Sequence, residues 1–288
     1  MPLDYEKLMQ TSFQSVRQSY GERDTILYAL GVGAGQDPSS DPSELRFVFE
    51  QGLQALPTMA VVLGYSGFWQ KEPQYGLTWQ KILHAEQSVQ WHRPVPPAAT
   101  VRGEMEIEAI YDKGAEKGAL LYSRRRIFDE QTGVHLATVR QGSFLRADGG
   151  FGGTGADAPR PAQIPDRTPD AVITLKTRPE QATLYRLSGD YNPLHIDPAV
   201  AKAGGFDRPI LHGLCTFGFA GRALLKALCD DEPAWLRRLD ARFSSPVFPG
   251  ETLRTEIWLS GAGSAHYRTI AEERSRTVID NGYAEYDT

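Results

Sequence analysis

The chain repeats itself at a fixed spacing of 152 residues, and this repeat restricts its possible folds more than any other feature. The segment Pro94-Val95-x-Pro97-x-x-Thr100-x-Arg102-x-Glu104 lies over Pro246-Val247-x-Pro249-x-x-Thr252-x-Arg254-x-Glu256, with six of eleven positions identical. The same spacing places Pro57 on Pro209, just before an apolar segment in each half. Such a pattern predicts two copies of one structural unit, joined head to tail.

The two halves also share an order of predicted elements. Each half has an apolar helix, hydrophobic on most faces and therefore buried, at residues 57–64 and 211–228. Strands rich in β-branched and aromatic residues follow at 83–91, 100–111, 119–128 and 136–145, and again at 239–243, 252–259, 267–273 and 277–285. Each unit is then a long helix wrapped by a curved antiparallel sheet, an α+β arrangement. Two such units extend their sheets edge to edge, because this covers an exposed edge strand.

These patterns divide the chain into residues 1–147, a linker at 148–170, and residues 171–288. The linker is rich in Gly, Pro, Ala and Asp and has almost no large apolar side chain. The residues up to Tyr20 are predicted to be helical, from apolar side chains at roughly helical intervals. The Gly-x-Gly-x-Gly run at 31–35 has no clear preceding strand and no later glycine of a dinucleotide fingerprint, so it favours close packing or a loop over nucleotide binding.

Composition places the chain among folded globular proteins, with 41% hydrophobic and 23% charged residues. The 31 basic and 36 acidic residues give a net charge of −5, which argues against a broad nucleic-acid surface. The most apolar stretch, residues 58–69, is too short to span a bilayer, so no membrane partner is expected. Cys215 and Cys229 form no disulfide or zinc framework, and the chain shows no signal pattern or Ser-Lys-Leu address. A cytoplasmic location is therefore expected.

One turn in the second half brings together two groups that transfer protons, Asp190 and His195. Asn192 precedes Pro193 and is therefore pushed away from helical dihedrals, which predicts a rigid, kinked turn. Asp197, also before a proline, has the pattern of a helix N-cap. The carboxylate and the imidazole can then converge on one small molecule, such as a water. Turn chemistry alone also explains a bare Asp and His at this spacing.

The longer pattern favours the catalytic interpretation. Leu-Ser-Gly-Asp-x-Asn-Pro-Leu-His over 187–195, followed by Pro-Ile-Leu-His-Gly-Leu over 209–214, resembles the signature of the MaoC-like, (R)-specific 2-enoyl-CoA hydratases, or hydratases 2. The resemblance covers nearly the whole chain and extends to the hydratase 2 region of peroxisomal multifunctional enzyme type 2. It implies a double hot-dog fold and the reversible hydration of trans-2-enoyl-CoA to (3R)-hydroxyacyl-CoA in fatty acid β-oxidation. It also implies an acyl-CoA substrate, no cofactor, and a homodimer.

The resemblance assigns roles to individual residues. Asp190 and His195 would deprotonate one water and return its proton on the same face of the substrate, and the Gly213 amide would stabilise the enolate oxygen. Asn192 would orient the turn. Glu86 would support the site, although a strand glutamate that faces solvent is an equally good interpretation. His212, just before Gly213, is interpreted as a structural histidine.

The two halves differ at the positions that carry this chemistry. The first half has Ala60 where the second has His212, and Val61 where the second has Gly213. In the two-unit hydratases the first half is understood to have lost its catalytic residues and to hold the acyl chain, and this sequence shows matching losses. No metal is expected, because the remaining histidines have no metal-ligand spacing; they are His92, His135 and His266.

Two other functions stay open. Hot-dog folds also host thioesterases, and a fold alone does not decide between activities. The other alternative is a non-catalytic module that binds acyl-CoA or an acyl carrier. A thioesterase is disfavoured because the Asn-Pro-Leu-His turn belongs to the hydratase pattern, and a binding module because Asp190, His195 and Gly213 are all present. Acyl transfer through a serine lacks support, because the sequence has no Gly-x-Ser-x-Gly elbow. The sequence does not predict the length or branching of the acyl chain.

Overall fold

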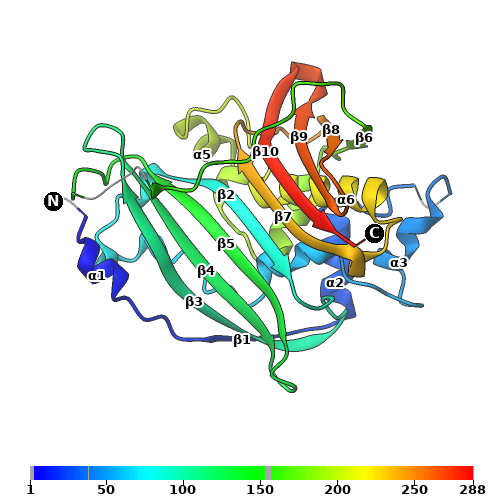
Figure 1. Ribbon diagram of the computed structural model, residues 1–288, viewed down its shortest axis with the longest axis horizontal. Coiled ribbons are helices and arrows are strands. Elements are labelled where there is room, and N and C mark those ends of the chain that lie inside the picture. The colour runs from blue at the N-terminus through cyan, green and yellow to red at the C-terminus, as the bar shows by residue number, and fades with distance from the viewer. Residues whose placement is uncertain (1–2, 38, 153–156, 288) are drawn as a thin grey trace.

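A single ten-stranded sheet organises the computed structural model of the protein, which describes residues 3–37, 39–152 and 157–287 (Figure 1). All neighbouring strands are antiparallel, in the order β1-β3-β4-β5-β2-β7-β10-β9-β8-β6. The strands of the first half are β1 (Val16–Tyr20), β2 (Ile82–Trp91), β3 (Ala99–Asp112), β4 (Ala119–Asp129) and β5 (His135–Leu145). Those of the second half are β6 (Ala171–Lys176), β7 (Leu236–Phe243), β8 (Thr252–Leu259), β9 (Ser264–Ala271) and β10 (Arg276–Tyr286).

The sheet has an internal two-fold relation that matches the sequence repeat. The order of strands is symmetric when β1, β3, β4, β5 and β2 are paired with β6, β8, β9, β10 and β7. At the centre, Ser88 of β2 lies opposite Asp240 of β7, and its Oγ donates to Asp240 Oδ1 at 2.5 Å. These two residues are 152 positions apart, which is the repeat spacing. The predicted edge-to-edge extension of the two half-sheets is therefore confirmed.

The second half wraps around one long helix, as predicted. Helix α6 (Gly213–Leu228) has 16 residues and packs against β6, β7, β8 and β10 (Figure 1). Its residues from Cys215 to Leu225 are all buried. Burial of one Leu or Phe side chain contributes about 1.5–3 kcal/mol, so this helix is a major source of stability for the second half.

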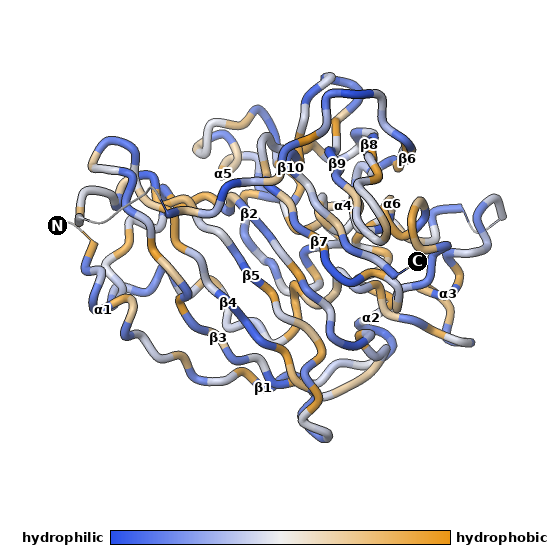
Figure 2. Tube along the Cα trace, viewed as in Figure 1, coloured by the Kyte–Doolittle hydropathy of each residue, from blue (hydrophilic) through white to orange (hydrophobic). Residues whose placement is uncertain are grey.

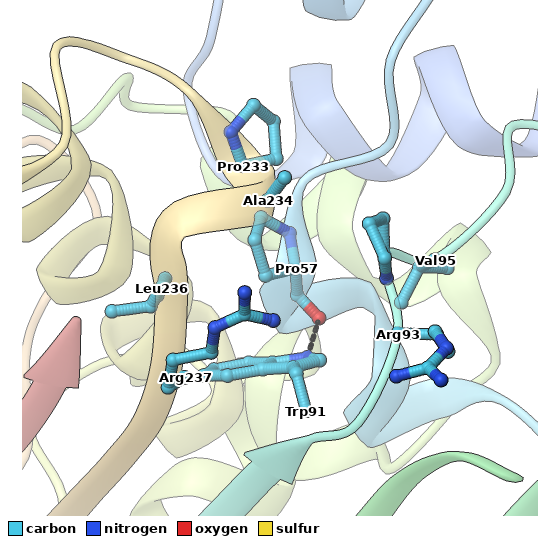
Figure 3. Close-up of a pocket in the computed structure, with 9 residues that line it drawn as sticks. Pro57, Trp91, Arg93, Val95, Pro233, Ala234, Leu236 and Arg237 are labelled. Carbon is cyan, nitrogen blue, oxygen red and sulfur yellow. Dashed lines mark hydrogen bonds between the residues drawn. The ribbon is translucent and has the colours of Figure 1, made fainter. Parts of the chain in front are cut away.

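The first half has only a short 3₁₀ segment, η2 (Pro57–Val62), where an apolar helix was predicted at 57–64. The chain leaves this segment at Gly64, which has a φ of 57° and passes so close to Gly103 of β3 that a side chain at Gly103 would overlap it. This crossing ends the helical turn. Trp91 fixes its start, because the indole Nε1 donates to the Pro57 carbonyl at 2.9 Å beside a small pocket between the halves (Figure 3).

The prediction of one helix up to Tyr20 was wrong. Helix α1 (Tyr5–Met9) stops after five residues, and β1 then pairs with β3 at one edge of the sheet. In β1 the more buried side chains are those of Val16, Gln18 and Tyr20, which is a period of two. In a segment this short, spaced apolar residues do not separate a helix from a strand, and the pairing with β3 decides.

The glycine run follows a helix instead of preceding one. Strand β1 leads into α2 (Glu22–Gly31), so a strand does come before the run, contrary to expectation, but the glycines lie at the helix end. A Cβ on Gly31 would come within 3.2 Å of the Tyr185 backbone, and one on Gly33 would overlap Phe219 of α6. The run therefore serves close packing between the halves, one of the two predicted alternatives.

Shorter elements complete the fold. The remaining α-helices are α3 (Leu45–Val48), α4 (Gln181–Tyr185) and α5 (Pro198–Ala203). The remaining 3₁₀ segments are η1 (Pro42–Glu44), η3 (Trp69–Lys71), η4 (Pro73–Tyr75), η5 (Trp79–Lys81), η7 (Arg186–Ser188), η8 (Pro193–His195), η9 (Pro233–Trp235) and η10 (Glu272–Arg274). No helix in the described ranges is long and apolar enough to cross a membrane. Part of the predicted linker, residues 153–156, lies outside the described residues, and the proposed division at 148–170 stays a prediction.

The two faces of the first half-sheet differ in polarity. Hydrophobic and hydrophilic residues alternate along β3, β4 and β5 (Figure 2). The inward side chains, such as Leu121 and Ile127, belong to the buried core. The outward ones form ion pairs between strands, including Arg140 with Glu108 at 2.6 Å. One half-sheet therefore covers an apolar interior and presents a charged outer face.

Candidate active site

The turn at Asp190 has the conformation expected from its sequence. Asn192 has a ψ of 121° before Pro193, and its side chain accepts a hydrogen bond from the Leu194 N–H at 3.1 Å. The Asp190 carboxylate accepts one from the Asn192 N–H at 3.2 Å. The turn then continues into η8, which ends at His195. Local hydrogen bonds therefore hold Asp190 and His195 at the two ends of one short segment.

His195 is half-buried and oriented by the main chain. Its Nδ1 donates to the Ile210 carbonyl at 2.9 Å. A carbonyl oxygen only accepts, so Nδ1 carries a proton and Nε2 of the neutral ring has a free lone pair. Burial lowers the pKa of His195 below its usual range, and the Asp190 carboxylate opposes this shift. The ring is therefore neutral at pH 7 and able to accept a proton through Nε2.

His212 completes the cluster from the position just before α6. Its ring centroid is 3.7 Å from that of His195, and its Nε2 donates to the main-chain carbonyl of Asp190 at 3.1 Å. Burial, reinforced by the neighbouring His195, lowers the pKa of His212 to about 3. The sequence predicts a structural role for His212. His212 contacts the Asp190 backbone and the His195 ring. It can therefore position both proposed catalytic residues.

Asp190, His195 and His212 each offer one ligand atom within 4.8 Å of the others. The spacing of histidines in the sequence did not indicate this group, because His195 and His212 belong to different elements. The signal that could have found it is the His-Gly pair at the predicted start of an apolar helix. A side chain at that position points back over the preceding loop, where the turn lies.

Gly213 is the first residue of α6. The first N–H groups of a helix have no partner within it, and the Gly213 N–H meets no hydrogen-bond acceptor in the described part of the chain. The helix N-terminus also carries a partial positive charge. A Cβ on Gly213 would lie 3.6 Å from the Phe243 ring, an ordinary contact, so the protein itself does not require a glycine here. This N–H is free to bind a ligand oxygen.

Two first-half residues that were not predicted also lie near the turn. His84 of β2 packs edge-on against Phe243, with 5.0 Å between ring centroids, and a Cβ at Gly213 would lie 3.6 Å from the same Phe243 ring. Burial lowers the pKa of His84 to about 4, and the charge of Asp190 acts on the pKa of both His84 and Tyr65. The pairing of β2 with β7 brings His84 here, and no local pattern in the sequence indicates such a pairing.

Glu86 was predicted to support the site. Its carboxylate accepts a hydrogen bond from the Tyr122 hydroxyl at 2.8 Å, within the first half. The structure thus gives Glu86 a partner on β4, and no hydrogen bond in the described residues joins it to Asp190 or His195. The supporting role of Glu86 stays a prediction.

Two family models match most of the chain. Residues 18–147 match the MFE-2 hydratase 2 N-terminal domain, and residues 161–282 match the MaoC like domain. The interval between the two matched ranges lies inside the predicted linker. The resemblance proposed from the turn is confirmed for both halves.

Two curated relatives and one solved structure are similar to nearly the whole chain. "Enoyl-CoA hydratase 2, peroxisomal" of Arabidopsis thaliana is 38% identical over 96% of this chain and 94% of its own length. "3-hydroxyacyl-thioester dehydratase Y" of Mycobacterium tuberculosis is 42% identical over 92% of each chain. A crystal structure of a MaoC-like dehydratase from Phytophthora capsici has a TM-score of 0.87 at 38% identity and 98% coverage of both chains.

The fold also matches a more distant structure. A Mycobacterium tuberculosis protein described as a double hotdog fold has a TM-score of 0.56 at 16% identity, and the match covers 96% of this chain and 95% of that one. At this identity only the fold is comparable. Together with the closer structure, it confirms the predicted α+β double hot-dog fold.

Proposed function

The chain belongs to the MaoC-like dehydratases of the hydratase 2 type, and from this membership we propose that it hydrates trans-2-enoyl-CoA to (3R)-hydroxyacyl-CoA. Membership of the family makes it a hydro-lyase. The names of the relatives support enoyl thioesters as substrates and hydration, or its reverse, as the reaction. The (3R) product and the roles of individual residues are the finer part of our proposal.

The convergence of Asp190 and His195 beside the free N–H of Gly213 is the observation that carries the proposal. Hydration of an enoyl thioester requires an activated water at C3, a proton at C2, and stabilisation of the enolate oxygen between the two steps. The turn supplies two proton acceptors, and the start of α6 supplies a donor. Each positioned acid or base typically contributes about 10²–10⁴-fold to the rate.

In the proposed reaction, one water donates hydrogen bonds to the Asp190 carboxylate and to Nε2 of His195. The water oxygen bonds to C3 as one of these groups takes a water proton, and the C2=C3 electron pair moves to the thioester oxygen. The resulting enolate then collapses, and the same group gives its proton to C2. Hydroxyl and proton arrive on one face, so the addition is syn. Asp190 and His195 are treated as one dyad, since coupled groups share their protons.

The enolate oxygen is proposed to accept a hydrogen bond from the Gly213 N–H. This donor lies at the positive end of α6 and is fixed before the substrate binds, so it needs no reorganisation during the reaction. His212 and Asn192 are proposed to hold the dyad in place, through the Asp190 carbonyl and the Asn192 N–H respectively. The reaction moves only the elements of water, so we propose that it needs no metal or other cofactor.

Three further points belong to the proposal. The first half, which has a 3₁₀ segment in place of a long helix, is proposed to hold the acyl chain. The protein is proposed to be a homodimer, as implied by the resemblance. A cytoplasmic location is supported by two buried, unpaired cysteines, which suit a reducing compartment, although one close relative is named as peroxisomal.

The test follows the absorbance of the conjugated thioester for trans-2-enoyl-CoA substrates of increasing chain length, and then the configuration of the product. We expect wild-type protein to give the (3R) product, and Asp190→Asn to lower kcat by at least about 10²-fold. Asp197→Asn is the matched control, because Asp197 only caps α5 and an asparagine caps equally well. Folded wild-type protein that hydrates no chain length would refute the proposal. Release of free thiol from saturated acyl-CoA would indicate a thioesterase.

A further inference from the structure

The cluster of Asp190, His195 and His212 has the ligand types that bind zinc. One ligand atom from each lies within 4.8 Å of the others. Zinc binds histidine nitrogen and carboxylate oxygen at about 2.0–2.2 Å, which sets neighbouring ligands of a tetrahedral site about 3.4 Å apart. The cluster therefore needs to contract by at most about 1.4 Å. Asp190 is half-exposed, so its carboxylate has room to rotate toward the two rings.

Both histidines are already held in the form that a metal ligand requires. His195 donates through Nδ1 to the Ile210 carbonyl, and His212 donates through Nε2 to the Asp190 carbonyl. Histidines that bind metals almost always donate their other ring N–H in this way, which fixes the tautomer and the direction of the ring. The lone pairs are therefore on His195 Nε2 and His212 Nδ1.

The His212 lone pair has no other use in the described structure. Its Nδ1 is buried and lacks a hydrogen-bond partner among the described residues, and the whole side chain is 1% exposed. The proposed hydration mechanism uses only the other nitrogen of this ring. A buried acceptor without a partner is unfavourable, and a bound cation would satisfy it.

We propose that Asp190, His195 and His212 bind one divalent transition-metal ion, Zn²⁺ in particular, and that the ion inhibits the enzyme by taking the place of the reacting water. Metal binding itself does not depend on the function proposed above, whereas inhibition rests on it. Bound zinc would occupy the lone pair of His195 and a carboxylate oxygen of Asp190. Both proposed proton acceptors would then be blocked.

A second pair of histidines provides an internal control. His92, the residue after β2, and His135 of β5 have ring centroids 4.2 Å apart, and both place Nε2 near Thr138 Oγ1, at 3.0 and 3.2 Å. In the described chain this pair has no third His, Cys, Asp or Glu close enough to complete a metal site. Any zinc bound there should bind more weakly than at the three-residue cluster.

The test measures Zn²⁺ binding to the full-length, chelator-treated protein by titration calorimetry, with the visible spectrum of Co²⁺ as a second readout. We expect one ion per chain. His212→Gln keeps an amide donor for the Asp190 carbonyl and removes the ring nitrogen, so it should weaken binding at least about tenfold. His135→Gln should bind as the wild type does. Equal binding by His212→Gln, or loss of binding in His135→Gln, would overturn the proposed site.

Thermal unfolding of each variant guards against misfolding. If His212→Gln does not fold, His195→Gln must show the same weakening. In the hydration assay, Zn²⁺ should inhibit over the concentration range in which it binds, and chelator should restore the rate. Zinc that binds at the cluster without inhibition would overturn the proposed displacement of water. If the wild-type protein hydrates no substrate but binds zinc, and His212→Gln loses that binding, the hydratase function is refuted and the metal site is supported.

Discussion

Replacing Gly213 with alanine tests whether this glycine is required for catalysis or for stability of the fold. A Cβ at this position lies 3.6 Å from two carbons of the Phe243 ring and 3.7 Å from a third, which are ordinary van der Waals distances. Alanine also favours a helix over glycine by up to about 1 kcal/mol. Gly213→Ala should therefore fold with a midpoint of thermal unfolding equal to or slightly above that of the wild type.

The effect on catalysis should be large. If the thioester oxygen approaches the Gly213 N–H, a methyl group at the start of α6 lies in its path and weakens that hydrogen bond. Removal of one donor of this kind costs about 10²–10³-fold in kcat in enzymes where it has been measured. We therefore expect kcat to fall by at least about tenfold, and KM to change less, because the enolate is stabilised more than the bound substrate.

The assay combines kcat and KM from the enoyl-CoA absorbance with the thermal midpoint. Gly218→Ala is the matched control, since a Cβ there would overlap Val32 in the core while the position is not at the start of α6. This control should lower the thermal midpoint but leave kcat per folded molecule close to normal. A kcat for Gly213→Ala within about twofold of wild type, in a protein of normal stability, would refute the role of its N–H.

Three further predictions concern stability. The pKa of His212 is about 3 in the folded chain and near 6.5 when unfolded, so the unfolded state binds more protons between these two pH values. As the pH falls from about 6.5 towards 3, the free energy of unfolding should therefore fall by up to about 1.4 kcal/mol per pH unit. Denaturant titrations of His212→Gln should show a smaller fall over the same pH range. Glu44→Gln leaves the buried Arg222 without its carboxylate partner and should lower the free energy of unfolding by about 3–5 kcal/mol, so a loss below about 1 kcal/mol would contradict the pairing. Ser88→Ala removes a hydrogen bond to the Asp240 carboxylate and should cost about 1.5–3 kcal/mol in the same measurement, and an unchanged midpoint would show that this bond is not stabilising.

Features that depend on neighbouring residues in the sequence were predicted well. Asn192 before Pro193 gives the extended backbone of the turn, and Asp197 caps α5 through the Ala199 N–H. The buried helix of the second half was found because its apolar residues extend over several turns. In each case the interactions that decide the conformation lie within one element or one turn.

The repeat predicted the joining of the two half-sheets, but several other features that depend on distant partners were not predicted. The short segments β1 and β6 are strands because each pairs at an edge of the sheet, with β3 and β8 respectively. The helix predicted at residues 57–64 is cut short by the crossing of Gly64 over β3. In the site, the contact between His195 and His212 joins two elements through the tertiary fold. Sequence patterns identify the residues of such contacts, but the fold decides which of them meet.

The pairing of Ser88 with Asp240 has a consequence for how the halves can be separated. A sheet seam between two identical chains places each central residue opposite its own copy, because such an interface is self-complementary. Two second halves joined through β7 would therefore set Asp240 against Asp240, and like charges directly opposite in a sheet are destabilising. Fusion into one chain allows a serine to face this carboxylate instead. The second half, which carries the proposed active site, is thereby suited to pair with the first half. Expressed alone, it would expose β7, and the Asp240 carboxylates would disfavour pairing of two copies through this strand.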